Sequence, residues 1–404
     1  MRFPDFEHDW ESKKLKDLSN IQRGASPRPI TAKKWYDNEN KKVGWVRIGD
    51  VTSSSKYLTK TEDYFSEEGV KKSRFLPKGS LIMSICATIG KPIVTGMDTC
   101  IHDGFVGFSE LKNINKEFLY YYLNILEPKF ISLSQTGSQA NLNSDLVRNA
   151  EIGVPSIQEQ EKIVNFISAV DKKHNILNKN LETQLSFKKY LMQQIFTQKL
   201  RFNFTDEWEK YLLGDISLIG KGFTPSTSNP SFWDGDLKWL SIADMNQGKY
   251  INQTTKKITS DGSKNKEPVK KGTLLMSFKL SIGKLGILTE DMYTNEAICN
   301  FKWKNKDVLT EYMYYYLSSI NILKYGSQAA KGITLNNETL STIPVLLPSL
   351  EEQKKIINIL SDVDMKINML ENSINDTSKF KKGLLQQMFI VQLILSLLQN
   401  KKHI

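Results

Sequence analysis

The chain has 404 residues, of which 40% are apolar and 25% charged, a balance that excludes a disordered protein and leaves room for two or three domains. Its formal net charge of +11 favours a polyanionic partner, because Lys and Arg side chains that neutralise phosphates release condensed counterions. The three cysteines match neither a disulfide framework nor a zinc pattern. We expect a cytoplasmic protein: residues 1–5 lack the apolar core of a signal peptide, and the apolar run Phe389–Leu398 is too short to cross a bilayer.

Short strands and an aromatic helix are predicted twice along the chain. Trp45–Ile48 and Ser80–Ile85 have strand composition between Gly, Pro, Asn and Asp residues, and Glu117–Asn124 is predicted to be a helix. Trp239–Ile242 and Glu311–Ser318 repeat this pattern later in the chain. The tyrosines of both helices are expected to pack in the core.

A long helix follows each of these stretches. The segments Ser156–Glu159 and Ser349–Glu352 have the spacing of a capping box, in which the Ser side chain binds the third helical amide and the Glu side chain binds the cap amide. Neither helix contains Pro, so each can run to about Phe196 or Phe389, a length of roughly 55–60 Å.

Each long helix carries an apolar seam with a 4-3-4-3-4 spacing, which is typical of a coiled coil. Two seams of equal register and length predict an antiparallel pair. A polar residue in the first seam, His174, either fixes the register or, as we favour, is a tolerated and partly exposed histidine. The seam positions are Ile163, Ile167, Val170, His174, Leu177 and Leu181 in the first helix and Ile356, Leu360, Val363, Ile367, Leu370 and Ile374 in the second.

The chain repeats itself. Leu81–Lys91 and Leu274–Lys284 share six of eleven residues at an offset of 193 (274 − 81). Because chance does not give one offset at several separated anchors, two copies of one fold are predicted. Segments 28–75 and 226–268 differ most, as expected for modules that read different targets or for loops that have drifted. Further matching pairs are Pro155–Gln160 with Pro348–Gln353, Glu117–Leu123 with Glu311–Leu317, and Leu191–Phe196 with Leu384–Phe389.

Several segments resemble the repeated signature of the specificity subunit of type I restriction–modification enzymes, and the resemblance covers essentially the whole chain. The segments are Pro155–Ile163, Pro348–Ile356, Gly222–Pro225 followed by Phe232 and Trp233, Trp239–Asp244, the two Leu-Met-Ser…Ile-Gly-Lys segments, and Gly137–Gln139 with Leu142 and Asn143.

The resemblance implies an α+β fold with two β-rich target-recognition domains, separated by two long antiparallel coiled-coil helices, in a pseudo-twofold internal repeat. It places recognition domains at 1–155 and 201–348 and spacer helices at 156–200 and 349–404. The tail Ile394–Ile404 lies beyond the repeat, and the simplest expectation for it is an extra packed turn.

The resemblance also implies a function. Each domain would read one half of a bipartite, asymmetric target in double-stranded DNA, and the helices would set the gap and dock two methyltransferase subunits. Two motor–nuclease subunits would complete the complex. The chain itself would not be an enzyme, and AdoMet, ATP and Mg would be bound by the partner subunits.

The residues themselves favour no catalytic site. Asn229–Phe232 is the closest match to a base-methyltransferase motif, but it lacks the second Pro, and no Gly-rich AdoMet loop or G-x-x-x-x-G-K-[ST] phosphate loop accompanies it. Cys100 and His102 could supply two metal ligands, but they have no second pair, which favours a structural role.

The DNA-contact candidates are basic and polar residues in predicted loops, because reading needs side chains that reach base edges and anchoring needs phosphate donors. Lys91 and Lys284 recur in both copies, so we expect them on phosphate rather than on bases. Any single Lys of the set is more often a solvated surface charge. The first-domain candidates are Arg23, Arg28, Lys33, Lys34, Lys71, Lys72, Arg74, Lys91, Gln135, Ser138 and Gln139. The second-domain candidates are Lys221, Thr224, Ser226, Lys256, Lys257, Lys264, Lys266, Lys279, Lys284, Gln328 and Lys331.

Two alternative functions stay open on the sequence. A coiled-coil interaction protein would have no nucleic-acid role, and a self-sufficient DNA methyltransferase would bind AdoMet. If the chain is a specificity subunit with both domains on one face of a duplex, its half-sites lie about one helical turn apart, roughly 34 Å or 10 bp.

Overall fold

The structure is a computed structural model that describes residues 2–134, 142–279, 281–329 and 332–390. Contacts divide the chain into two compact units, Met1–Leu177 with Ser373–Ile404, and Asn178–Asn372. Each long helix therefore contributes one part to each unit. The packed turn expected at 394–404 lies outside the described residues.

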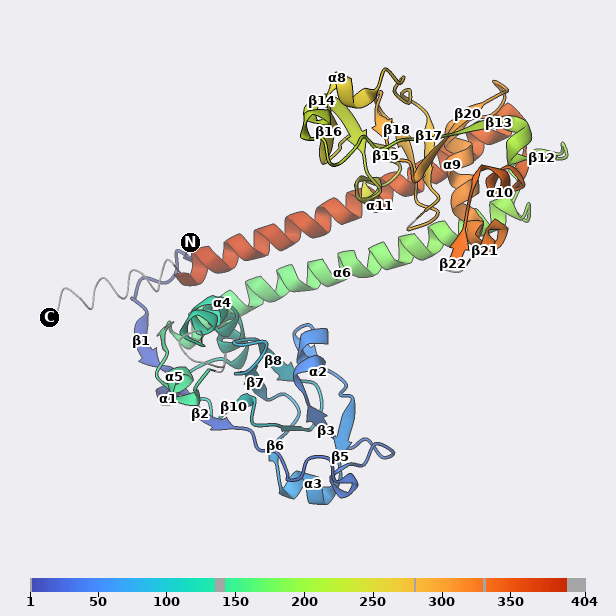
Figure 1. Cartoon of the computed structure of the whole chain (residues 1–404). Helices are drawn as coiled ribbons and strands as arrows, with labels where there is room; N and C mark the ends of the chain where they lie inside the picture. The colour runs from blue at the N-terminus through green and yellow to red at the C-terminus, as the bar shows by residue number, and fades with distance from the viewer. Residues whose placement is uncertain (1, 135–141, 280, 330–331, 391–404) are drawn as a thin grey trace. The chain divides into compact units, whose positions relative to one another are not determined.

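The main sheet of the first unit has the strand order β2-β10-β7-β8-β4. Figure 1 labels its strands β2, β10, β7 and β8. Its neighbours pair antiparallel except β4, which lies parallel to β8. Every side chain of β7 and β8 is buried, because both faces of these strands are covered. The strand predicted at Ser80–Ile85 is confirmed as β7. The bounds are β2 (Asn20–Arg23), β4 (Tyr57–Leu58), β7 (Leu81–Ser84), β8 (Pro92–Thr95) and β10 (Phe105–Ser109).

A second sheet of the first unit has the order β5-β3-β9-β6. Trp45 and Phe65 stack in its core with ring centroids 4.3 Å apart. The strand predicted at Trp45–Ile48 ends at Val46, because Ile48 begins a helix whose cap amide donates to Asp50 at 2.8 Å. The bounds are β3 (Val43–Val46), β5 (Asp63–Phe65), β6 (Arg74–Leu76), β9 (Thr99–Ile101), η1 (Lys33–Trp35), α2 (Ile48–Ser53) and α3 (Glu67–Lys71).

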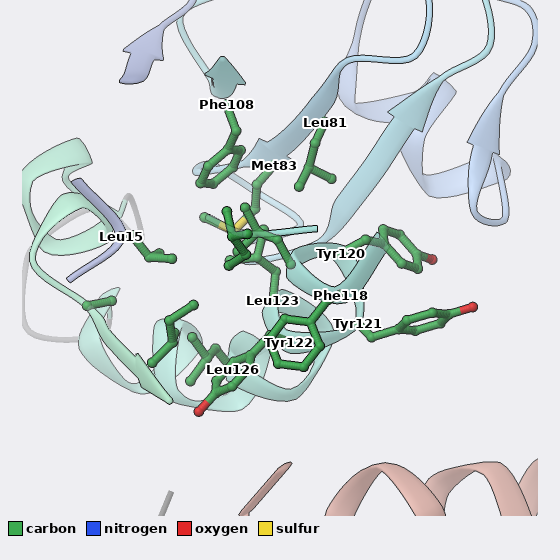
Figure 2. Close-up of a cluster of buried hydrophobic side chains, with 14 of the residues drawn as sticks. Leu15, Leu81, Met83, Phe108, Phe118, Tyr120, Tyr121, Tyr122, Leu123 and Leu126 are labelled. Carbon is green, nitrogen blue, oxygen red and sulfur yellow. The ribbon is translucent and has the colours of Figure 1, made fainter. Parts of the chain in front are cut away.

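Helix α4 (Lys116–Ser134) covers the main sheet of this unit. Phe118 and Leu123 of α4 belong to the same buried cluster as Met83 and Phe108 of the sheet (Figure 2). The predicted core position of the tyrosines is confirmed for Tyr121, which is 1% exposed, and for its neighbours. The remaining elements of this part are β1 (Glu11–Lys14), which pairs with β11 (Glu151–Val154), α1 (Leu15–Leu18) and α5 (Ser144–Arg148).

The second unit repeats this plan. Its main sheet has the order β13-β20-β17-β18-β15, with β15 again parallel to its neighbour, and α9 packs on it. The strand predicted at Trp239–Ile242 is the end of β14, which stops at Leu240. The strands are β12 (Glu209–Leu212), β13 (Ser217–Lys221), β14 (Trp233–Leu240), β15 (Tyr250–Ile251), β16 (Lys256–Ile258), β17 (Leu274–Ser277), β18 (Leu285–Leu288), β19 (Tyr293–Thr294), β20 (Ile298–Trp303), β21 (Ser327–Ala329), β22 (Gly332–Thr334) and β23 (Pro344–Leu347). The helices are α7 (Leu213–Ile216), η2 (Pro230–Phe232), η3 (Ala243–Asn246), α8 (Ser260–Ser263), α9 (Thr310–Ser319), η4 (Ile322–Tyr325) and α10 (Asn337–Ser341).

The long helices are α6 (Ile157–Phe196) and α11 (Leu350–Leu385), and a π-helical turn, η5 (Gln386–Ile390), extends the latter. The predicted seam follows the burial along both helices. Ile163, Ile167, Ile356 and Leu360 are at most 1% exposed, and the later seam positions, His174 included, are buried or half-buried. No helix within the described ranges is long and apolar enough to cross a membrane.

Only half of each predicted capping box forms. The Glu352 amide donates to Ser349 Oγ at 3.4 Å, but the Glu352 carboxylate does not return to the cap. It accepts two bonds from Arg201, at 2.7 and 2.8 Å, and one from the Trp208 indole at 3.0 Å. The prediction of a reciprocal box was wrong because these distant partners take the carboxylate. The equivalent contacts in the first unit join Glu159 to Ser156, Arg2 and Trp10.

Within each unit the two long helices run antiparallel, as predicted. In the first unit Lys381 of α11 lies 2.5 Å from Asp171 of α6, and the earlier α6 residue Ile167 clusters with the later α11 residue Met388. In the second unit Lys188 of α6 lies 2.6 Å from Asp364 of α11.

The last turn of each long helix enters the core beside the other copy's β-rich domain. Phe389 lies 6.1 Å from Trp10 and 5.2 Å from both Phe118 and Tyr122, measured between ring centroids. Phe196 lies at 5.9 and 5.5 Å from Tyr312 and Tyr316. Each core is therefore completed by a helix of the other repeat.

Candidate nucleic-acid interface

Each β-rich domain has a tight backbone crossing just after the first strand of its main sheet. A Cβ atom on Gly24 would lie 2.0 Å from the carbonyl oxygen of His102, and one on Gly222 would lie 2.0 Å from that of Thr294. Only glycine permits so close an approach. The crossings leave Arg23 exposed at the end of β2, and Lys221 lies exposed at the end of β13.

A polar group surrounds Arg23 in the first unit. Arg23 Nε donates to the Asp103 carbonyl at 2.6 Å, and the Asp103 carboxylate accepts from Ser26 Oγ at 3.0 Å. Burial opposes ionisation of Asp103, but the bond from Ser26 and the nearby charges outweigh it, so the pKa of Asp103 is lowered. An exposed cation and an ionised acceptor in one group could bind both acceptor and amino groups on base edges.

The other first-domain candidates gather on the second sheet and its helices. Trp35 Nε1 donates to the Pro29 carbonyl at 2.9 Å and Ser73 Oγ donates to the Ala25 carbonyl at 2.6 Å, which joins the loop after β2 to η1 and β6. The Lys34 ammonium lies 4.3 Å from the centre of the Trp35 ring. The exposed candidates of this region are Arg28, Lys33, Lys34, Lys71, Lys72 and Arg74.

In the second unit, lysine ammonium groups lie over aromatic rings. Trp233 and Trp239 meet with ring centroids 5.1 Å apart, the Lys256 ammonium lies 5.3 Å from Trp233, and the Lys266 ammonium lies 4.6 Å from Phe223. Exposed cations on aromatic faces combine phosphate attraction with stacking surface. The Ser226 carbonyl accepts from Trp233, and Lys257 and Lys264 are exposed on β16 and just after α8.

The recurring lysines have partners inside the protein. Lys91 Nζ donates to the carbonyls of Thr52 and Ser54 at 3.3 and 3.4 Å, at the end of α2. Lys284 Nζ donates to Asn246 Oδ1 at 2.7 Å. Both lysines are half-buried, so they support loops, and their expected phosphate contact stays a prediction. Lys279 is exposed beside the Phe278 ring.

Some candidates fall at the edge of what the structure describes. Gln135, Ser138, Gln139 and Lys331 lie outside the described residues, and Gln328 lies in β21. The described chain resumes at Leu142, whose amide donates to the Ile85 carbonyl at 2.8 Å, beside the turn that leads to Lys91.

Sequence reasoning omitted the acidic residues of these surfaces. Glu296 accepts from the Thr224 hydroxyl, which also accepts from Asn295 Nδ2 at 2.9 Å. Glu296 aligns with Asp103 at the repeat offset of 193, and Thr224 occupies the place of Ser26. The predicted contacts included only basic, amide and hydroxyl side chains, although the repeat alignment of Asp103 with Glu296 is visible in the sequence.

The residues that most resembled chemical motifs have structural roles. The Asn229 side chain caps η2 by accepting from the Ser231 amide at 3.1 Å. Burial raises the pKa of the Cys100 thiol to about 12, so the thiolate that a metal would need is disfavoured. Throughout the described residues no three His, Cys, Asp or Glu side chains are grouped as metal ligands.

A family model described as type I restriction modification DNA specificity domain matches the chain twice, over residues 7–186 and 205–377. Each match therefore spans one β-rich domain and much of the long helix that follows it.

Individual relatives agree with this match. The MjaIX specificity subunit of Methanocaldococcus jannaschii is 30% identical over 175 residues, which is 41% of this chain and only 39% of that protein. The putative MjaX specificity subunit of the same organism is 24% identical over 412 residues, covering 93% of this chain and 92% of that protein. The EcoBI specificity subunit of Escherichia coli is 21% identical over 91% of this chain and 82% of its own length.

Solved structures share the fold. An S subunit of a type I restriction–modification system from M. genitalium gives a TM-score of 0.59 at 14% identity, covering 94% of this chain and 96% of that one. A chain from a study of complex assembly and conformational transition in a type I R-M system gives 0.61 at 15% identity, over 94% and 97%. The predicted α+β fold, with two β-rich recognition domains and long helices in an internal repeat, is confirmed.

Proposed function

Because the chain belongs to the family of type I restriction modification DNA specificity domains, we propose that it is the specificity subunit of such a complex. Each recognition domain reads one half of a bipartite, asymmetric DNA target, and the long helices set the number of unread base pairs between the halves. The observation that carries this proposal is the repeat: both units keep one frame, while segments 28–75 and 226–268 differ.

The surfaces support DNA as the ligand. Exposed cations surround the Gly24 crossing in the first unit and the Phe223 and Trp233 rings in the second, and such groups can hold phosphates while neighbouring polar side chains read base edges. The two surfaces also differ in chemistry, which supports different half-sites: the first has exposed arginines at Arg23, Arg28 and Arg74, whereas the cations among the second-domain candidates are all lysines.

The long helices support two copies of one partner. Ile176 and Phe380, 51% and 55% exposed, lie on the helices of the first unit. Met369 and Phe187, 59% and 46% exposed, are their repeat equivalents in the second. Large exposed apolar side chains at the same repeat position in both units support an equivalent partner contact in each unit. We infer two docked methyltransferase subunits and, with two motor–nuclease subunits, a complete complex whose AdoMet, ATP and Mg chemistry lies outside this chain.

The test is the salt dependence of DNA binding by the chain with its methyltransferase subunit. A reader with six or more phosphate contacts loses about 10³-fold or more in affinity between roughly 50 and 200 mM salt. A flat response would favour a coiled-coil interaction protein instead.

A matched set of variants sharpens this test. Lys256→Gln and Lys266→Gln should each reduce the salt slope by about 1, because each removes one phosphate contact. Lys306→Gln is the control, since Lys306 is exposed in the turn where the Asp307 carbonyl binds Gln353 of α11. Equal slopes for all three variants would place the DNA surface elsewhere.

A further inference from the structure

A chain of charged and hydrogen-bonded side chains joins each recognition domain to both long helices. It runs from the loop before an edge strand, through the aromatic helix, to one long helix and then the other. We call it the tether network. Its members are Lys249, Glu311, Tyr315, Asp364 and Lys188 in the second unit, and Lys56, Glu117, Tyr121, Asp171 and Lys381 in the first.

In the second unit every link has good geometry. Lys249 Nζ, just before β15, donates to Glu311 at 2.9 Å and to Tyr315 Oη at 3.3 Å, both on α9. The Tyr315 hydroxyl donates to Asp364 Oδ2 of α11 at 2.6 Å. The other oxygen of Asp364 lies 2.6 Å from Lys188 Nζ of α6. Four elements of the unit are thus connected by four residue-to-residue bonds.

The first unit has the same links. Lys56 pairs with Glu117 and donates to Tyr121 Oη at 3.1 Å. Tyr121 donates to Asp171 Oδ2 at 2.7 Å, and Asp171 Oδ1 lies 2.5 Å from Lys381 Nζ. In Figure 2 the Tyr121 hydroxyl points away from the buried cluster of Leu81 and Met83, so the ring packs in the core while its oxygen reaches the helices.

The charged side chains of the network are half-buried. The Lys56 and Lys249 side chains are only 17% and 10% exposed. Burial lowers the pKa of Lys56, but its bonds to Glu117 and Tyr121 outweigh that effect, and the pKa is raised. Two lysines and two carboxylates pair in each unit, so no charge of the network is left without an opposite charge beside it.

The two tether networks consist of the same residue types, although the two recognition domains differ in sequence. All five positions carry the same residue type in both units, whereas flanking helix positions differ, such as Lys172 against Met365 and Asn178 against Glu371. Residues shared by two different readers cannot select bases. Their common task must concern how each domain is held on its helices.

We propose that the tether network fixes the angle of each recognition domain on the helix pair and thereby makes the target gap strict. Directional bonds between half-buried charged groups define one orientation, because a small displacement leaves a charge unpaired, whereas apolar side chains can slide with little loss. The five residues are positioning residues and do not touch DNA. This inference rests on the proposed function.

The experiment compares methyl transfer on four DNAs, using the complete chain with its methyltransferase subunit. The DNAs carry both half-sites at the natural gap, one base pair shorter and one longer, and a fourth DNA has one altered half-site base. The variants are Asp364→Asn and Lys188→Met, both singly and together, with the exposed neighbour Lys189→Met as control.

We expect discrimination between the natural and altered gaps to fall about tenfold in each single variant, the effect of losing one charged hydrogen bond. The double variant should lose no more gap discrimination than either single variant, because both changes break the same pair, Asp364 with Lys188. Discrimination against the altered half-site base should stay unchanged, as should all ratios of Lys189→Met.

Unchanged gap discrimination would overturn the proposal, and so would equal losses of gap and base discrimination, which would indicate a general structural role. If these variants fail to fold, Tyr315→Phe, which keeps the ring and removes the link, is judged by the same ratios. Failure of the proposed function is visible separately, because the unaltered chain would then have no gapped target.

Discussion

The buried carboxylates at the start of the long helices bind partners far away in the sequence. Glu352 has a side chain only 2% exposed, and Arg201 holds it with two bonds while Trp208 supplies a third. A buried charge that loses its partner is costly, so this contact helps to fix α11 against the segment before β12. The same arrangement around Glu159 serves α6.

Neutralising this carboxylate should therefore weaken the second unit. Glu352→Gln is expected to lower the free energy of unfolding by about 2–3 kcal/mol, because it removes the charged hydrogen bonds from Arg201. The exposed neighbour Glu351 provides the control, and Glu351→Gln should change the free energy of unfolding by less than about 0.5 kcal/mol. Denaturant unfolding measures both, and equal stabilities of the two variants would contradict this account.

At the scale of elements, the ends of the long helices act as core segments. Phe389 is fully buried among aromatic side chains of the first unit, and Phe196 is similarly enclosed in the second. Each β-rich domain thus depends on a helix from the other repeat, so neither domain with only its own following helix has a complete core.

Replacing Phe389 with alanine should destabilise the first unit, and replacing Phe196 should destabilise the second. Phe389→Ala is expected to cost about 3–5 kcal/mol and to speed hydrogen exchange in α4 and β11, while Phe196→Ala should do the same in α9 and β23. Exchange measured by mass spectrometry separates the two patterns. Faster exchange of α9 in the Phe389→Ala protein would contradict the assignment.

Regular elements were predictable from the sequence because their signals are local or periodic. The predicted seams, Ile163 to Leu181 on α6 and Ile356 to Ile374 on α11, match the burial of these helices. The internal repeat correctly predicted that both copies have the same sheet topology. Ile48 was wrongly predicted to be in a strand. It begins a helix in which the Asp50 side chain accepts from the Arg47 amide, and the residue composition of the segment does not reveal this contact.

Contacts that join distant segments could not be predicted from the sequence. The partners of Glu159, and the links of Lys56 to Tyr121 and of Tyr121 to Asp171, depend on how the helix, sheet and loop meet. The repeat did contain one signal, since Lys56 and Lys249 align at the offset of 193. Asp103 and Glu296 were not predicted as DNA contacts, because phosphate attraction favours cations and gives no signal for a carboxylate.

At the scale of the whole molecule, the helices should act as a ruler, since α6 and α11 each pass from one unit into the other. Inserting about four residues into both helices, between residues 177 and 178 and between 372 and 373, adds roughly 6 Å, or about two base pairs. The unread gap should lengthen while both half-sites stay the same. Altered half-sites at the original gap would show that the helices do not set the spacing.

The most direct test of the central claim is the methylome of a host that carries this chain and its methyltransferase subunit. The account predicts one asymmetric motif made of two different half-sites about 10 bp apart between centres, with unspecified bases between them. A continuous, ungapped motif would contradict it.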